Sequence, residues 1–222
     1  MNVLHYVQAF FSDHAHWQGY DGIPTRVGEH IGYTLEALAL AALIGLPVGL
    51  LTGHFGRGGN TLSLIATAAR ALPTFGLLVL MTMLIGFGML PVMIPLVVLA
   101  VPPILVTTYE AVRSVDRSPV DAARGMGMRE AGVLLRVELP VALPLILGGL
   151  RSAAIQIVST ATIAAYVSLG GLGRYIVDGL YQRDYEKVVG GATLVAGLAL
   201  VTLGLFWAVG RVAVSAGVRR AD

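Results

Sequence analysis

The chain has 222 residues, of which 56% are hydrophobic and 13% are charged, and its mean hydropathy is +0.78. Soluble globular domains carry roughly twice that charged fraction, so the composition excludes an ordinary soluble protein. The absence of cysteine excludes disulfides and thiolate metal sites. Several apolar runs exceed the about 18 residues that cross a bilayer as a helix, which predicts an all-α, polytopic membrane protein with about five spans.

The N-terminal segment, residues 1–28, is predicted to be extracytoplasmic or interfacial. It lacks the basic start, continuous apolar core and small-residue cleavage site of a signal peptide. Its apolar side chains fall on one helical face, which indicates a surface-lying helix. These side chains are Val3, Leu4, Val7, Phe10 and Phe11. The spacing of His5, His14, His16 and His30 does not form a convincing ligand set, so we interpret them as interfacial polar residues rather than a metal site.

The first span is expected over residues 31–53, where Gly45, Gly49 and Gly53 recur every four residues. This spacing predicts a face that packs closely against another helix, and Pro47 is expected to kink the span. The following loop, residues 54–60, is rich in glycine but lacks the Gly-Lys-Ser/Thr ending of a phosphate-binding loop. Because Lys187 is the only lysine, we do not expect this chain to bind ATP by that route.

Residues 61–88 are too long for one upright span and contain Arg70 and Pro73. Two interpretations remain open: a long tilted helix that bends at Pro73, or an interfacial piece before a shorter span.

The third span, residues 92–112, contains Pro95 and the pair Pro102-Pro103, which we expect to break it. A doubly broken helix indicates a pathway element, whereas a merely kinked packing helix is the alternative. The polar candidates for pathway lining in this span are Thr107, Thr108 and Tyr109.

The fourth span is expected over residues 141–167. One of its faces carries a polar stripe at helical spacing, which indicates either pathway lining or hydrogen bonds between helices. The stripe consists of Ser152, Gln156, Ser159 and Thr160. Arg151 must pair or extend to the interface. An external loop at 168–187, a fifth span at 188–212 and a cytoplasmic tail at 213–222 are expected to follow.

Residues 118–140 form the longest charged island in the chain. Ser118 is the predicted helix cap, and Pro119 suits the first helical position. Asp121 is favourable near the positive end of the helix, and Gly125 and Gly127 are expected to end it. This pattern predicts a short amphipathic helix, a break, and a second short helix that runs into Pro140.

Part of this island has the spacing of a known motif: Asp121-Ala122-Ala123, three residues, Gly127, nine residues, Val137, one residue, Leu139-Pro140. It resembles the EAA loop of type I ABC-importer permeases, which has Glu in place of Asp121 and Ile in place of Val137. The alternative is a charged cytoplasmic loop that merely joins two spans. The resemblance implies that the loop docks into a separate ATPase subunit. The coupling residues are then Ser118, Asp121, Ala122, Ala123, Gly125, Gly127, Val137, Leu139 and Pro140.

Further segments are similar to permeases for osmoprotectants such as glycine betaine, carnitine and choline. They cover about residues 22–212, and one departure is Val106-Thr107, where that family often has Arg-Asn. The similar segments are 22–30, 72–74, 86–88, 103–109, 115–116 and 167–173.

The resemblance implies an ABC transmembrane type-1 domain over residues 29–212 in a bacterial cytoplasmic membrane. The chain is then a transport subunit rather than an enzyme and holds no cofactor, with ATP and Mg on the partner ATPase. The implied partners are two ATP-binding subunits, a second permease chain in a homo- or heterodimer, an extracytoplasmic solute-binding protein and lipid, but no nucleic acid.

Two other functions remain as alternatives. One is an ABC permease for amino acids such as methionine. The other is a self-sufficient secondary transporter, for which inverted repeats and buried carboxylates are typical. We find no internal repeat, and Glu36 and Glu110 lie near span ends.

With five spans, the two termini lie on opposite sides of the membrane. The side that holds the charged island carries nine arginines, and the other side carries four basic residues. The positive-inside rule therefore places the N-terminus outside and the island and C-terminus in the cytoplasm. The nine are Arg57, Arg113, Arg117, Arg124, Arg129, Arg136, Arg211, Arg219 and Arg220; the four are Arg26, Arg174, Arg183 and Lys187.

Overall fold

A computed structural model describes residues 3–214, and within this range all regular structure is helical. Four helices are long and apolar enough to cross a bilayer: α2 (Ile23–Phe55), α5 (Met89–Arg113), the continuous helix Glu130–Val167, and α10 (Tyr185–Ala213). The pair α3 (Gly59–Ala71) and α4 (Thr74–Ile85) supplies a fifth span if it is counted as one. The predicted all-α, polytopic class is therefore confirmed.

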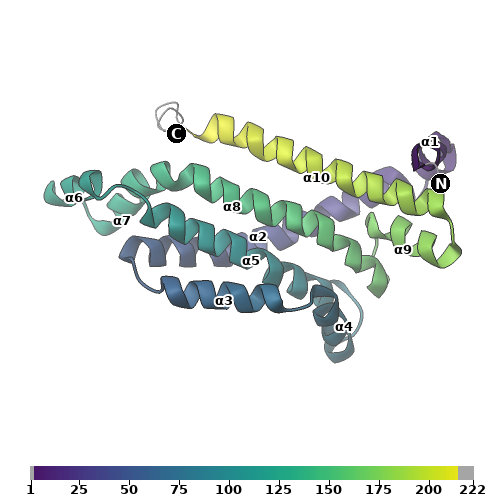
Figure 1. Ribbon diagram of the computed structural model, residues 1–222, viewed down its shortest axis with the longest axis horizontal. Helices are drawn as coiled ribbons and strands as arrows, with labels where there is room; N and C mark the ends of the chain where they lie inside the picture. Colours follow the sequence, from purple (N-terminus) through teal and green to yellow (C-terminus); the bar gives the residue numbers. More distant parts are fainter. Residues whose placement is uncertain (1–2, 215–222) are drawn as a thin grey trace.

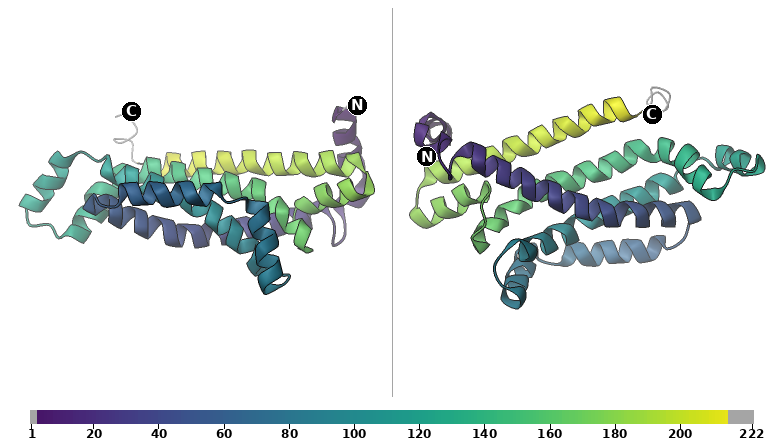
Figure 2. Two further views of the ribbon diagram at one scale, coloured as in Figure 1. Left: turned by 60° about the horizontal axis from the view of Figure 1, so that its bottom comes forward. Right: turned by 180° about the vertical axis from the view of Figure 1, so that it is seen from behind.

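The long helices lie side by side with α5 near the centre (Figure 1). α5 packs against α2, against α3, and against α8 (Leu139–Thr160), while α10 covers α8 from the other side. Fully buried side chains such as Leu96, Ile104 and Ile157 form the main core between these helices. α1 (Val3–Ser12) and α9 (Gly173–Gln182) lie at one end of the bundle. α6 (Arg117–Gly125) and α7 (Glu130–Val133) lie at the other end (Figure 2).

The glycines of the first span face α5, as their spacing predicts. A Cβ atom on Gly45 would lie 2.9 Å from Cγ2 of Ile104, and one on Gly53 would lie 2.9 Å from the carbonyl oxygen of Tyr109. At Gly49 the distance to the carbonyl oxygen of Leu105 would be 2.8 Å. The two helix backbones therefore approach too closely for any side chain at these positions.

The segment after α2 breaks at Pro73, where α3 and α4 meet at 78°. α3 runs along α5 through the contact of Leu62 with Leu105 and Tyr109, whereas α4 turns away from the bundle (Figure 2). The break follows because proline cannot donate the next helical hydrogen bond and disfavours helical geometry in the residue before it.

Several boundaries differ from the sequence-based expectation, and α2 begins at Ile23 rather than at residue 31. α5 continues unbroken through Pro95 and Pro102-Pro103, so the prediction of a doubly broken third span is wrong. These prolines are buried in the bundle, and packing on α2 and α8 holds the helix despite the missing hydrogen bonds.

The predicted end of a short helix at Pro140 is also wrong. α7 continues through a π-helical turn, Leu134–Glu138, into α8, and a 3₁₀ segment, Ala161–Val167, completes this helix. The widened turn lies directly before Pro140, where it relieves the clash of the proline ring with the preceding turn.

The expected external loop at 168–187 contains a helix, α9, which the sequence analysis did not anticipate. Its side chain Tyr175 packs with Leu172 against Phe10 of α1 and Ile23 of α2. This small apolar cluster ties the N-terminal helix to the bundle and stabilises α9 by burial.

Candidate functional site

The charged hairpin consists of α6, α7 and the residues between them. It begins at Asp116 rather than at Ser118. The Asp116 carboxylate accepts a hydrogen bond from the Ser118 backbone N–H at 3.1 Å, and α6 starts at Arg117. The prediction of Ser118 as the cap is therefore wrong. The carboxylate of Asp116, two residues earlier, caps the helix in its place, and Pro119 lies within the first turn, where it costs little.

α6 has one buried and one exposed face. Val120 and Ala123 pack against a cluster that includes Val112, Val115 and Val133, and this cluster holds α6 against the ends of α5 and α8. Asp121 and Ala122 face solvent, as do Ser118, Gly125 and Gly127. Val137 and Leu139 pack on the buried cluster from the α8 side, and Pro140 is exposed. The exposed face of α6 is therefore small and smooth, and it extends beyond the ends of the spans (Figure 2).

Gly127 ends the break after α6 with a backbone φ of 82°. Only glycine adopts this left-handed geometry without cost. We expect Gly127→Val to destabilise the hairpin by about 1–3 kcal/mol, measured by thermal unfolding of the purified chain in detergent. Gly125→Ala is the matched control, because Gly125 has helical geometry and open space around its Cβ position. Equal unfolding temperatures for Gly127→Val and the wild-type chain would show that this geometry is not required.

A charged network connects the hairpin to α2. Arg124 binds Glu130 through Nη2 and Oε2 at 2.9 Å, and also lies 3.7 Å from Asp121. His54, at the end of α2, donates from Nδ1 to Oε2 of Glu138 at 2.5 Å. Its Nε2 lies 3.0 Å from Oε2 of Glu130, at ion-pair distance but outside hydrogen-bond geometry. The sequence analysis missed His54, Glu130 and Glu138, although each is a charged or ionisable residue at the edge of an apolar run.

The polar residues proposed to line a pathway lie on different surfaces. On α8, Ser152 and Ser159 are exposed, while Gln156 and Thr160 are half-buried. The Oε1 atom of Gln156 is buried and has no hydrogen-bond partner among residues 3–214. An unpaired buried amide oxygen is costly, so we expect Gln156 to accept a hydrogen bond from a group outside the described residues.

The polar residues of α5 lie at helix contacts. Thr107 donates to the carbonyl oxygen of Pro103 at 2.6 Å and lies against Gly149 of α8. Thr108 is buried, and Tyr109, also buried, accepts a hydrogen bond from Nη1 of Arg113 at 2.5 Å. The structure thus places these three residues between α5 and its neighbours.

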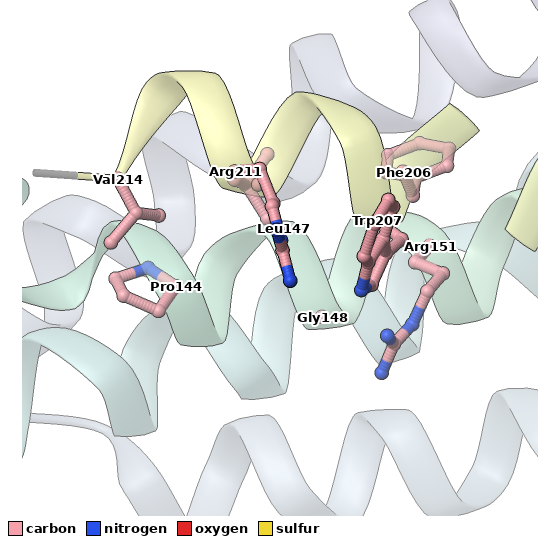
Figure 3. A pocket seen from close by; sticks show the side chains of 9 residues that line it. Pro144, Leu147, Gly148, Arg151, Phe206, Trp207, Arg211 and Val214 are labelled. Atoms are coloured by element: carbon pink, nitrogen blue, oxygen red, sulfur yellow. The ribbon is translucent and has the colours of Figure 1, made fainter. Parts of the chain in front are cut away.

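A groove of about 320 Å³ runs between α8 and α10 (Figure 3). Its lining combines Phe206 and Trp207 with two basic residues, Arg151 and Arg211, and the Arg211 guanidinium lies 4.4 Å from the centre of the Trp207 ring. Arg151 forms no ion pair within the part of the chain that the structure describes. The groove is therefore positively charged and partly aromatic.

The opposite end of the bundle is held by two residues of α2. Glu29 accepts a hydrogen bond from the Gly171 N–H at 2.7 Å, and a Cβ atom at Gly170 would collide with its carboxylate. His30 bonds the Val158 carbonyl oxygen through Nε2 at 2.8 Å and accepts from the Leu172 N–H at 3.3 Å. His30 is fully buried, so its interpretation as an interfacial residue is wrong. The glycine run at 170–173 is explained by this close contact.

Tyr175 of α9 adds to this end of the structure. Its hydroxyl donates to the carbonyl oxygen of Asp21 at 2.6 Å, and burial raises the pKa of Tyr175 to about 12. The phenol therefore stays protonated and keeps this donor at neutral pH. The contact joins α9 to the segment that precedes α2.

The sequence matches the family described as "Binding-protein-dependent transport system inner membrane component" over residues 45–220. It is 35% identical to the choline transport system permease protein OpuBB of Bacillus subtilis, with 78% of this chain and 80% of that protein covered. It is 30% identical to the carnitine transport permease protein OpuCB of Listeria monocytogenes, with 88% and 87% covered.

Among solved structures, the inward-facing MetNI methionine ABC transporter has a chain that is 26% identical and superposes with a TM-score of 0.73. The match covers 86% of this chain and 95% of that one. The sequence, the fold and the hairpin thus agree with one another. The chain belongs to the family of binding-protein-dependent ABC-importer permeases and is the membrane-spanning permease subunit of such an importer.

Proposed function

We propose that this permease imports osmoprotectants of the glycine betaine, carnitine and choline type. Relatives named for choline and carnitine are similar over most of both chains, at 35% and 30% identity. The Escherichia coli ProW protein, named for glycine betaine and proline betaine, is 30% identical over 86% of this chain. The methionine transporter is similar in fold at 26% identity, which supports the shared architecture more than a shared solute.

The drive for transport comes from a separate ATPase in this proposal. The observation that carries it is that α6 extends beyond the ends of the spans (Figure 2) and exposes Asp121 and Ala122. A small, smooth helical face suits insertion into a cleft on a partner. The printed sequence has a single lysine and lacks the motif of a phosphate-binding loop, so ATP and Mg belong to the partner.

The assembly then contains two permease chains, as a homo- or heterodimer, with two ATPases on the α6 side and a solute-binding protein on the α9 side. The Arg distribution supports an orientation in which α6 and the end of α10 lie in the cytoplasm and α1 lies outside. This orientation agrees with the positions of α6 and α1 at opposite ends of the bundle.

Transport follows an alternating-access cycle in which ATP binding closes the two ATPases and moves both copies of α6. The residues proposed to line the pathway are Ser152, Gln156, Ser159 and Thr160 of α8, together with the Thr107–Tyr109 stretch of α5. Quaternary ammonium groups bind aromatic cages through cation–π contacts, and no such cluster is evident from the sequence spacing. Solute selection is therefore assigned mainly to the binding protein.

Uptake measurements with the reconstituted importer test the solute class. We expect ATP-dependent uptake of labelled glycine betaine, carnitine or choline, and no uptake of methionine. Uptake of an amino acid alone would contradict the osmoprotectant assignment. Uptake driven by an ion gradient, with the permease as the sole protein, would instead indicate a secondary transporter.

A further inference from the structure

Besides the exposed face of α6, the hairpin has a second feature: a series of contacts between ionisable side chains that leads from α6 into the bundle. It passes from Arg124 to Glu130 at 2.9 Å and from Glu130 to His54 at 3.0 Å. From His54 it continues to Glu138 at 2.5 Å. These side chains therefore link three helical elements: α6, α2, and the continuous helix that contains α7 and α8.

Burial of the side chains increases along this series of contacts. The side chains of Arg124 and Glu130 are 35% and 54% exposed, whereas those of His54 and Glu138 are 3% and 1% exposed. A buried carboxylate requires a cation or donors around it, and the His54 imidazole is the hydrogen-bond partner that the structure shows for Glu138. The buried His54–Glu138 pair therefore resists separation strongly, whereas the exposed Arg124–Glu130 pair separates at lower cost.

The backbone shows how His54 links α2 to the helix that contains α7 and α8. Glu130 and Glu138 lie on one continuous helix, so displacement of α7 passes directly to α8. α2 is a separate element, and at this end its contact with the hairpin side includes the imidazole between the two carboxylates. His54 also lies one residue beyond Gly53, which holds the end of α2 against α5.

We infer that Glu130 and His54 are positioning residues that transmit the movement of α6 to α2 and α8 together. The inference rests on the proposed docking of an ATPase on α6. In this arrangement Arg124 contacts Glu130 and Glu130 contacts His54, so a displacement of α6 reaches α2. The buried His54–Glu138 pair makes α2 and α8 move together. Loss of the Glu130–His54 contact leaves ATPase binding intact but lets α6 move without the spans.

Glu130→Ala is the first test, because Glu130 is exposed and its replacement leaves the buried pair in place. In proteoliposomes with the ATPase and the loaded binding protein, we expect stimulated ATP hydrolysis to persist. The amount of solute imported per ATP should fall about fivefold or more. Arg129→Ala is the matched control: it is the neighbouring exposed charge, it forms no ion pair in residues 3–214, and it should import as the wild-type chain does.

His54→Gln and the double variant His54→Gln/Glu130→Ala complete the cycle. If both residues serve one link, the double variant should import no less solute per ATP than the more severe single variant. The inference would be overturned if the defects of the single variants multiplied in the double variant. It would also be overturned if Glu130→Ala imported as much solute per ATP as the wild-type chain. Because His54→Gln leaves a buried carboxylate alone, Glu130→Ala by itself decides the matter if the His54 variants fail to fold.

Asp121→Lys separates this inference from the proposed function. If Asp121→Lys no longer binds the ATPase, while Glu130→Ala binds it but imports less solute per ATP, both the docking of the ATPase on α6 and the transmission by Glu130 and His54 stand. If Asp121→Lys retains the ATPase and normal uptake, the docking assignment fails and the inference fails with it. If only Glu130→Ala behaves as wild type, docking stands and the transmission by Glu130 and His54 is wrong.

Discussion

Asp121→Lys should abolish ATP-driven uptake while the chain still inserts into the membrane. The Asp121 side chain is 70% exposed, so its replacement costs the fold little. The substitution reverses a charge on the face of α6 that is proposed to enter the ATPase and places a second cation beside Arg124, 3.7 Å away. A misplaced like charge in an interface costs several kcal/mol, which corresponds to a loss of affinity on the order of a hundredfold or more.

The measurement is co-purification of the ATPase with the permease, together with solute uptake in proteoliposomes. Asp121→Glu is the matched control, since it keeps the charge and restores the residue of the EAA pattern. We expect this control to bind the ATPase and to transport normally. Normal ATPase binding by Asp121→Lys would remove the docking role from this face of α6.

Gly49→Leu should have the largest effect on the stability of the bundle. Its Cβ atom would lie 2.7 Å from Cβ of Thr108 and 2.8 Å from the carbonyl oxygen of Leu105. Because the second of these atoms belongs to the α5 backbone, α2 and α5 must separate to make room. Overpacking of a core costs about 1–3 kcal/mol and more where backbone must move, so we expect a loss above about 3 kcal/mol.

Thermal unfolding of the purified permease in detergent measures this effect, either by tryptophan fluorescence or by the fraction that remains monodisperse after heating. Gly32→Leu is the matched control on the same helix, because its Cβ position has open space around it. We expect the control to unfold near the wild-type temperature. Similar unfolding temperatures for Gly49→Leu and Gly32→Leu would contradict the close approach of α2 and α5.

Much of the molecule follows from local pattern. Apolar runs predict the spans because a bilayer core admits only helices long enough to cross it. The four-residue glycine spacing identifies the contact face of α2, and the spacing of Asp121, Gly127 and Pro140 points to the family. These signals lie within one helix or one loop, so they need no knowledge of neighbouring elements.

The failures at the prolines of α5 and at His30 share one physical cause, which is that packing neighbours override local preference. Pro95 and Pro102-Pro103 do not break α5, since helices on both sides hold it. His30 is buried rather than interfacial because Val158 and Leu172, more than a hundred positions away, supply its two hydrogen bonds. A carboxylate at 116 rather than the hydroxyl at 118 caps α6.

The sequence by itself therefore determined the membrane class, the approximate spans and the family, and it predicts a docking loop. Only the tertiary structure decided which charged groups meet. His54 and Glu138 are 84 residues apart in the chain, yet they form a buried pair at 2.5 Å. No local spacing encodes that contact, because it depends on how α2 and α8 pack around α5 and on the π-helical turn that carries Glu138.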